Sequence, residues 1–469
     1  MSETRTLARH IVNTRSSEIP EDVRHEGKRA LLNIVGCALG GATHPAVDAA
    51  IRALASVFGA PTAIVLGRAE RMDPLHASLM NGLTSHVLDY DDTMPKNYGH
   101  HSSPVASALL AYASVNQVSG RDLLDAFIIG FETSARVANA VYPAHYDAGW
   151  HMTGTAGVFG AAAAVGRVAG LNEQQMVWAL GLAATQAAGL REMFGSMAKS
   201  FHPGRSAQNG YASVLLAREG FTSGERSLEG PRGFAAVQAA RHDLSKITNG
   251  LGVDFELRDN TYKPFPCGIV IHPTIDGCIQ LHDEHGLRPD SIAAVRLRVA
   301  PLVLDLCNQK NITKGLQGKF SVYHGAAIGL VRGRGGLAEF TDDAVNDPAI
   351  RRVREATTAT ADPSITEDQS SIDVQLTDGR VLTRFVEASL GNLRRPLSDQ
   401  QLEAKCREQA LLVLSSEEAE RLIGLCWNVD ELGDASELVA AGVRSLSNPK
   451  FQIPNPKPQD SQLEPETKD

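Results

Sequence analysis

The spacing of apolar residues changes once along this chain, and that change constrains the fold more than any other feature. From residue 1 to about 265, apolar side chains recur every three or four positions, as at Leu123 and Phe127. This period is typical of helices that bury one face. Cap signatures at Ser119 and Asn172 mark the beginnings of two such helices. Residues 1–265 are therefore predicted to form an all-helical domain.

After about residue 268 the period becomes two. Residues 295–299 alternate Val, Leu and Val with two arginines, which is the pattern of a half-buried strand. An Asp-Gly pair lies between two further alternating runs, 372–376 and 381–385, and this arrangement is a strong hairpin signal. Residues 268–396 are therefore predicted to form a smaller α+β domain.

Helical spacing returns after Ser398, a predicted cap, and continues to about residue 446. Residues 397–446 are expected to pack on the first helical domain, so the predicted fold class is mostly α. A chain of 469 residues is too long for one typical core, which agrees with two domains. The Pro-rich, polar tail, 448–469, is predicted to be disordered.

Composition excludes several classes of protein. The net charge is −9 and no long basic stretch is present, so a nucleic-acid partner is not expected. The most apolar stretch, 154–170, is interrupted by Arg167 and is too short to span a bilayer. The N-terminus lacks the apolar segment of a signal peptide. We therefore expect a cytoplasmic protein without membrane contacts.

The cysteine spacing favours no metal site. None of the six cysteines belongs to a CxxC pair, and their spacing fits neither zinc nor an iron–sulfur cluster. We interpret them as small core residues. They are Cys37, Cys267, Cys278, Cys307, Cys406 and Cys426.

Four segments combine ionisable side chains with glycine or proline in a way that a plain helical scaffold does not require. They are His86–Thr93 with Gly99–Pro104, Gly149–Gly157, Lys199–Arg205, and Tyr262–Cys267 followed by His272. Histidine suits acid–base catalysis near neutral pH, and lysine near a helix start suits carboxylate binding. Taken singly, each has an ordinary structural alternative: a solvated turn, a core histidine or a surface lysine.

These segments resemble, in order, the signature blocks of the MmgE/PrpD (2-methylcitrate dehydratase-like) family. The blocks are HVLDYDDT, GHHSSPVASALLAYA, GWHMTGTAGVFGAAAAVGRVAGL, LAATQAAGL, KSFHPGRSAQNGYASVLLAREGFTS, YKPFPCGIVIHPTID and GKFSVYHGAAIGLVRG. The resemblance covers nearly the whole chain except its ends. It implies a large helical domain, a smaller lid domain inserted before the last helices, a homodimer, and chemistry that requires no metal or organic cofactor.

The resemblance also implies a set of site residues. The catalytic residues would be His100, His151 and Asp89, with His100 as proton donor or acceptor. The residues that bind a small anionic substrate would be Thr93, Lys199, Lys263, His202 and His324. His101 replaces a proline that is usual in the family block, and His324 takes the position of a tyrosine, which changes both reach and pKa.

Known activities in the family are 2-methylcitrate dehydration, cis-aconitate decarboxylation and iminodisuccinate epimerisation. All three transfer a proton at a carbon next to a carboxylate. The leading interpretation is therefore a cofactor-independent lyase of a small di- or tricarboxylate, with dehydration ahead of decarboxylation. An epimerase of an amino- or imino-dicarboxylate is the alternative enzyme. A catalytically inactive ligand-binding homologue is less favoured, because His100, His151, Lys199 and Lys263 are all present.

Overall fold

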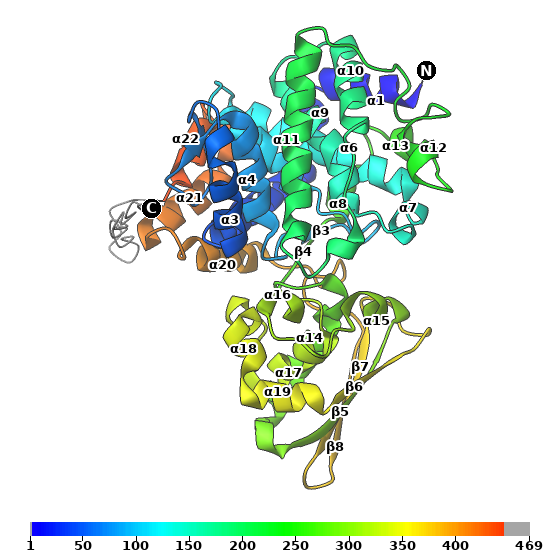
Figure 1. Cartoon of the computed structure of the whole chain (residues 1–469), viewed down its shortest axis with the longest axis vertical. Helices are drawn as coiled ribbons and strands as arrows, with labels where there is room; N and C mark the ends of the chain where they lie inside the picture. Colours follow the sequence, from blue (N-terminus) through cyan, green and yellow to red (C-terminus); the bar gives the residue numbers. More distant parts are fainter. Residues whose placement is uncertain (1, 445–469) are drawn as a thin grey trace, which may run out of the picture.

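The computed structural model describes residues 2–444, which form a helical domain and a mixed domain that meet end to end (Figure 1). The predicted class, mostly helical with a smaller mixed domain, is confirmed. The tail predicted to be disordered, 448–469, lies outside the described residues, as do residues 445–446 at the end of the last predicted helical segment.

The helical domain is built from two separate stretches of chain. Its longest helices, α2, α6 and α11, are buried along most of their length. The helices of the first stretch are α1 (Glu3–Asn13), α2 (Glu21–Gly41), α3 (Pro45–Leu54), α4 (Pro74–His86), α5 (Ser102–Ala113), α6 (Gly120–Val141), α7 (Ala144–Asp147), α8 (Met152–Thr155), α9 (Gly157–Val168), α10 (Glu173–Ala184), α11 (Ala198–Arg218), α12 (Phe234–Gln238) and α13 (Ser245–Thr248). The second stretch gives α20 (Asp399–Ala410), α21 (Ser416–Trp427) and α22 (Ser436–Ala441).

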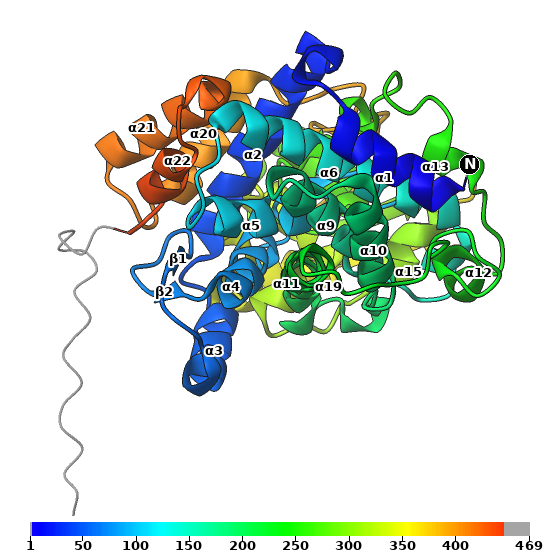
Figure 2. The same ribbon diagram turned by 90° about the horizontal axis from the view of Figure 1, so that it is seen from above.

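Helix α11 lies at the centre of this domain, seen end-on in Figure 2 among α4, α5, α9 and α10. Glycines allow α4 and α11 to approach closely. A Cβ on Gly82 would lie 2.4 Å from the Cα of Gly204, closer than side-chain atoms pack. This approach brings the end of α4 beside the first turns of α11, where the ionisable residues of both segments are found.

Two pairs of very short strands interrupt the helical domain, so it is not all-helical as predicted. Strand β1 (Ala63–Ile64) pairs with β2 (Arg71–Met72), and β3 (Asp92–Thr93) pairs with β4 (Thr261–Tyr262), both antiparallel. A strand of two residues has no detectable period, which explains why the sequence did not reveal them. The β3–β4 pair fixes the chain where it passes into the mixed domain.

The mixed domain folds around a four-stranded sheet with the order β6-β5-β7-β8. Strand β5 runs parallel to β6 and antiparallel to β7, and the predicted β7–β8 hairpin is confirmed. Gly379 in its turn has φ +90, a left-handed conformation that favours glycine. The elements are α14 (His272–His285), β5 (Ile292–Val299), α15 (Pro301–Cys307), α16 (Gly315–Gly318), α17 (Val322–Arg332), α18 (Asp342–Asn346), α19 (Pro348–Glu355), β6 (Thr357–Ala361), β7 (Ser370–Leu376) and β8 (Val381–Val386).

The last helices return to the helical domain, where α20 packs on α2. The Nζ of Lys405 on α20 donates to Asn33 Oδ1 on α2 at 2.7 Å and to the carbonyl oxygen of Tyr90 at 2.6 Å. The side chain of Ser398 accepts a hydrogen bond from the backbone N–H of Gln401, as the predicted cap requires. The chain thus crosses between the two domains twice.

Within residues 2–444, no single helix has the length and apolar character needed to cross a membrane. One bent pair, Glu21–Gly41 with Pro45–Val57, meets the length and composition test when its two parts are taken together, with an angle of 77° between them.

A buried ion pair on α6 fixes the loop that leads toward β4. Arg136 is 1% exposed, and its Nε donates to Glu132 Oε1 at 2.5 Å. Its other nitrogens donate to the carbonyl oxygens of Asn249 at 2.7 Å and Asp254 at 2.6 Å. One side chain therefore holds both a helix and a distant loop.

We expect Arg136→Met to lower the free energy of unfolding by about 3–5 kcal/mol, because it removes the only cation paired with the buried carboxylate of Glu132 among the described residues and the donors to several backbone carbonyl oxygens. Denaturant titration measures this change. The matched control is Arg351→Met, which breaks the exposed pair Arg351–Glu355 with the same helical spacing. That variant should lose about 0.3–0.5 kcal/mol. Equal losses in the two variants would contradict the structural role of Arg136.

Candidate active site

One pocket at the junction of the two domains contains most of the predicted site residues. Its volume is about 40 Å³. It is lined by Asp89, Thr93, Tyr98, His100, Tyr146, His151, Phe194, Lys199, Lys263, Gly268, Ile269, Val270, Leu306, Cys307 and Phe320. Six of the eight predicted site residues are in this set, and the other two, His202 and His324, are not.

Short segments beside helix ends present the polar side chains of the pocket. Asp89 follows the end of α4 and has φ +53, a left-handed conformation that aspartate tolerates better than most residues. Lys199 lies in the first turn of α11, and His151 immediately precedes α8. Lys263 directly follows β4, so the β3–β4 pair sets its position. Each group is held by backbone that has little freedom to move.

Asp89 and two lysines form the charged centre of the site. Asp89 Oδ1 accepts from Lys199 Nζ at 2.5 Å and from Lys263 Nζ at 2.7 Å. Burial alone would raise the pKa of Asp89, but the charges of Lys199 and Lys263 outweigh it and hold this pKa well below its ordinary value. The other oxygen, Oδ2, is buried and has no hydrogen-bond partner within residues 2–444. Asp89 is therefore ionised, with one oxygen directed at neither lysine.

The two lysines differ in the number of N–H groups that remain for a ligand. Lys263 also donates to the carbonyl oxygens of Asp89 at 3.1 Å and Cys267 at 3.0 Å, so its three N–H groups all have acceptors. Lys199 has only Asp89 as an acceptor in the described part of the chain. Burial would lower the pKa of Lys263, but Asp89 and Asp91 raise it above its ordinary value, whereas burial lowers the pKa of Lys199 despite Asp89. Lys199 is thus the lysine with donors free for a substrate carboxylate.

His100 has the geometry of a general base. Its Nδ1 lies 2.7 Å from the carbonyl oxygen of Asp92, which can only accept, so Nδ1 carries the proton and Nε2 carries the lone pair. No described residue forms a hydrogen bond with this Nε2. Burial lowers the pKa of His100 well below its ordinary value, and Lys199 adds to the shift while Asp91 opposes it. The ring is therefore neutral at physiological pH.

His101, the neighbour of His100, faces away from the pocket. Its Nδ1 lies 2.7 Å from Ser134 Oγ and its Nε2 lies 3.1 Å from Asn97 Oδ1. Burial lowers its pKa to about 3. Both ring nitrogens are therefore used in packing the helical domain, and His101 has no part in the pocket.

The site also contains His86 and Asp91, which were inside a segment that the sequence singled out but were not chosen. His86 Nδ1 lies 2.9 Å from Asp91 Oδ2, and its ring centroid lies 4.6 Å from that of His100. Its Nε2 is buried without a partner among the described residues. Asp91 Oδ2 lies 3.6 Å from His100 Nδ1. The Asp-rich segment 89–92 drew attention to this part of the sequence. The conformation of the turn after α4 determines which of its side chains are directed toward the site.

The backbone carbonyl group of Asp92 accepts a hydrogen bond from the His100 ring and so orients it. The side-chain Oδ2 of Asp92 accepts from Ser102 Oγ at 2.6 Å and from Asn260 Nδ2 at 2.9 Å. Burial and the nearby charge of Asp91 raise the pKa of Asp92 to about 7. This carboxyl group fixes β3 and thereby the carbonyl group that orients the His100 ring.

His202 was predicted to bind substrate, but it lies behind His151 instead of lining the pocket. The Nδ1 atoms of the two rings are 2.9 Å apart, so one ring donates to the other. Burial lowers the pKa of His202 to about 4 and keeps it neutral. His202 is one turn further along α11 than Lys199, which displaces it toward α8. It therefore orients His151, whose Nε2 is buried and has no described partner.

The prediction that His324 contributes to the pocket is also wrong. His324 lies inside the mixed domain, where its Nε2 is 2.9 Å from the carbonyl oxygen of Glu339 and its ring packs against Phe340. Tyr323 is bound to Asn308. Phe320 precedes α17 and faces the pocket in their place. Counting along the helix could not show that the residue before its first turn is the one directed inward.

Lys319 is a further residue that the sequence did not single out. Its Nζ donates to the carbonyl oxygens of Leu88 at 2.5 Å and Pro266 at 2.6 Å. Burial lowers its pKa to about 8. Because Leu88 precedes Asp89, Lys319 connects the mixed domain to the turn that carries the charged centre.

The clustered side chains offer nitrogen and oxygen atoms of the kind that bind metals. Candidate ligand atoms of His86, His100 and His151 all lie within 4.8 Å of one another. The ammonium groups of Lys199 and Lys263 form ion pairs with Asp89, however, and their positive charges would repel a divalent cation. The fixed charges and the lysine donors therefore fit a carboxylate better than a metal ion.

An apolar wall faces this charged centre. Phe194 and Phe320 stack with ring centroids 5.9 Å apart, and both lie near Lys199 Nζ, at 5.3 and 5.6 Å. Leu306 and Val270 complete this side of the lining. Low polarity on one side strengthens the electrostatic interactions on the other. The pocket can therefore bind a carboxylate and stabilise negative charge that develops beside it.

The chain is similar to proteins named as cis-aconitate decarboxylases and as a 2-methylcitrate dehydratase. A cis-aconitate decarboxylase-like protein, oryM, of Aspergillus oryzae is 26% identical over 468 residues, which cover 93% of this chain and 96% of the relative. Human cis-aconitate decarboxylase is 26% identical over 454 residues, covering 93% and 94%. The 2-methylcitrate dehydratase of Escherichia coli is 23% identical over 419 residues, covering 81% and 83%.

The sequence profile of the MmgE/PrpD N-terminal domain matches residues 5–246, and that of the MmgE/PrpD C-terminal domain matches residues 265–430. The first match falls on the helical domain, and the second covers the mixed domain together with α20 and α21 of the helical domain; the two matches span most of the chain. This protein belongs to the MmgE/PrpD family.

Proposed function

We propose that this protein is a lyase that transfers a proton at the carbon next to a carboxylate of a small carboxylic acid. The observation that supports the proposal most strongly is the neutral His100, whose Nε2 lone pair is free beside the paired lysines of Asp89. The substrate class agrees with the names of the relatives, which act on small carboxylic acids.

The proposed first step uses the groups of the pocket without a metal or organic cofactor. A substrate carboxylate accepts from the free N–H groups of Lys199. His100 Nε2 removes the proton from the adjacent carbon, and the C–H electron pair moves into the carboxylate as an enediolate. The charges of Lys199 and Lys263 stabilise that enediolate. The proton on His100 is then available for the next step.

The fate of the carbanion distinguishes the possible reactions. Loss of hydroxide gives dehydration, and return of a proton on the opposite face, from His151, gives epimerisation. In decarboxylation, the C–C electron pair becomes the carbanion as carbon dioxide leaves, so the neutral His100 must first take up a proton from solvent, which it then delivers to that carbon. The relatives named cis-aconitate decarboxylase cover at least 91% of the chain, against 81% for the 2-methylcitrate dehydratase. We therefore place decarboxylation ahead of the dehydration that the sequence favoured. A homodimer and a cytoplasmic location stay predictions.

A screen of di- and tricarboxylic acids by proton NMR in deuterated water tests the proposed function. We expect at least one acid to lose its signal at the carbon next to a carboxylate, with loss of carbon dioxide, loss of water or exchange alone identifying the reaction. The rate should be unchanged after treatment with a chelator, because the lysines supply the positive charge. Activity that returns only on adding iron or zinc would contradict the metal-free mechanism, and no exchange with any acid would favour an inactive homologue.

We expect His100→Gln to reduce turnover about 10²–10⁴-fold, the usual contribution of a general acid–base group. The matched control is His101→Gln, which removes an adjacent, equally buried histidine that does not face the pocket. His101→Gln should retain turnover in the fraction of protein that circular dichroism shows to be folded. Equal losses in two folded variants would rule out a specific role for His100.

The pH dependence should reflect the lowered pKa of His100. A general base works only when it is neutral, and an ordinary histidine takes up a proton as the pH falls through 6.5. Because burial lowers the pKa of His100, its ring stays neutral below that pH. In a reaction that begins with proton removal, such as dehydration or epimerisation, kcat/KM corrected for ionisation of the acid should stay within about twofold between pH 7 and pH 6. In decarboxylation, which needs the protonated ring, it should instead rise as the pH falls. An acid limb centred at pH 6.5 would show that the base has an unshifted pKa.

A further inference from the structure

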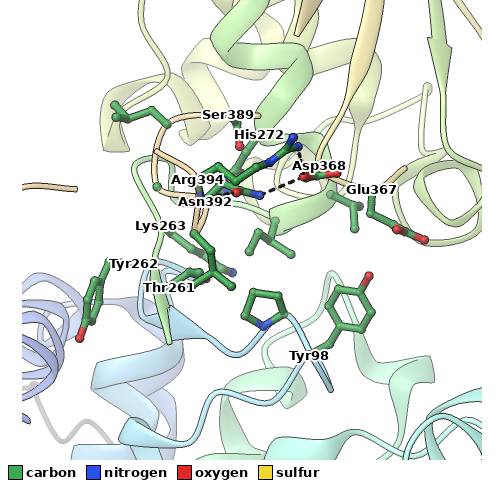
Figure 3. A pocket seen from close by; sticks show the side chains of 16 residues that line it. Tyr98, Thr261, Tyr262, Lys263, His272, Glu367, Asp368, Ser389, Asn392 and Arg394 are labelled. Atoms are coloured by element: carbon green, nitrogen blue, oxygen red, sulfur yellow. Dashed lines mark hydrogen bonds and ion pairs between the residues drawn. The ribbon is translucent and has the colours of Figure 1, made fainter. Parts of the chain in front are cut away.

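A second and larger cavity adjoins the catalytic pocket at the domain junction (Figure 3). We call it the junction chamber; its volume is about 330 Å³. In Figure 3, Ser389, Asn392 and Arg394 lie above the chamber and Tyr98 lies below it. The residues that line both cavities are Tyr98, Lys263, Ile269 and Val270. These four residues form the boundary that the two cavities share.

The two cavity volumes imply that the reacting end of a ligand and the rest of that ligand lie in different cavities. The catalytic pocket, at about 40 Å³, has room for roughly three water molecules, since one water occupies about 10–15 Å³ on this measure. That is enough for a carboxylate and the carbon beside it, but not for a whole dicarboxylic acid. The junction chamber provides the space that the catalytic pocket lacks.

The chamber lining is mainly apolar, through Pro95, Ile269, Val270, Leu390 and Leu393. Leu393 is 45% exposed, so an apolar occupant would remove hydrophobic surface from water.

The charged side chains of the chamber would make the binding of a second substrate carboxylate there unfavourable. Arg394 donates to Asp368 Oδ2 at 2.6 Å, and the side chain of Asn392 donates to the same oxygen at 3.3 Å. Glu367 adds a second acidic group to the lining. Arg394 is therefore already paired, and Lys263, the other cation of this lining, has acceptors for all three of its N–H groups. An anionic group would in addition meet the carboxylates of Glu367 and Asp368.

One buried polar atom lies unused in the lining. His272 is 2% exposed, and its Nε2 has no hydrogen-bond partner within residues 2–444. Burial lowers the pKa of His272 to about 3, so the ring is neutral. In a neutral ring, Nε2 either accepts or donates one hydrogen bond, according to the tautomer. A hydroxyl group on the occupant would satisfy it in either case.

We propose that the substrate carries an uncharged, mainly apolar tail that occupies the junction chamber while its carboxylate end reacts in the catalytic pocket. This inference rests on the proposed function, which places the carboxylate at Lys199. It narrows the substrate class from small polycarboxylates in general to acids with one carboxylate-bearing end and an alkyl chain, with or without a hydroxyl group.

Calorimetric titration with propanoate, hexanoate and decanoate, which carry one carboxylate and tails of increasing length, tests the proposal on the full-length protein. We expect the affinity to rise with tail length by up to about fourfold for each buried methylene, until the chamber is filled. Leu393→Ser should reduce this gain and leave the binding of propanoate unchanged. Leu411→Ser is the matched control, because Leu411 is also 45% exposed but lies outside both cavities.

An affinity independent of tail length, or an equal loss of gain in the two serine variants, would overturn the proposal. Deuterium exchange of the same three acids is followed in parallel to separate the two hypotheses. Exchange without a tail effect would leave the proposed function in place and remove the chamber's role. If affinity rises with tail length and only Leu393→Ser reduces that rise, while none of the acids exchanges its protons for deuterium, the role of the junction chamber is supported and the proposed function is contradicted.

Discussion

The site depends on one buried carboxylate shared by two lysines. Asp89 Oδ1 binds Lys199 from α11 and Lys263 from the segment after β4. Each of these charges would be unfavourable alone in a pocket of this polarity, and each is stabilised by the others. Because the partners come from three distant parts of the chain, this interaction holds the end of α4, the start of α11 and the link to the mixed domain in one arrangement.

Burial determines the state of the histidines beside the lysines, and the positive charge of Lys199 adds to its effect. His86, His100 and His151 are all buried beside Lys199, and burial together with that charge lowers their pKa values. Neutral imidazoles next to fixed cations are suited to removing a proton while a negative charge develops. Backbone and side-chain partners select which nitrogen is free in each ring: Asp92 for His100, Asp91 for His86 and His202 for His151.

The mixed domain completes the site from the opposite side. It supplies Phe320 to the apolar wall and Lys319, which binds the carbonyl oxygen of Leu88 beside the Asp89 turn. The loop that carries Leu390 and Leu393 forms one side of the junction chamber. Reactive groups therefore belong mainly to the helical domain, whereas the mixed domain contributes the surfaces that would contact the rest of a substrate.

The sequence by itself determined the two kinds of secondary structure, because a change of hydrophobic period needs only local spacing. Unusual local chemistry marked the segments of the site, and the resemblance of those segments to the family implied six of the residues that line the pocket. The sequence did not reveal the β3–β4 pair, whose strands are too short to show a period. The roles of His202, His324, Phe320 and Lys319 were decided only by the tertiary structure. Which side of a helix faces a pocket, and which N–H groups of a lysine stay free, depend on partners far away in the sequence, and local spacing carries no information about them.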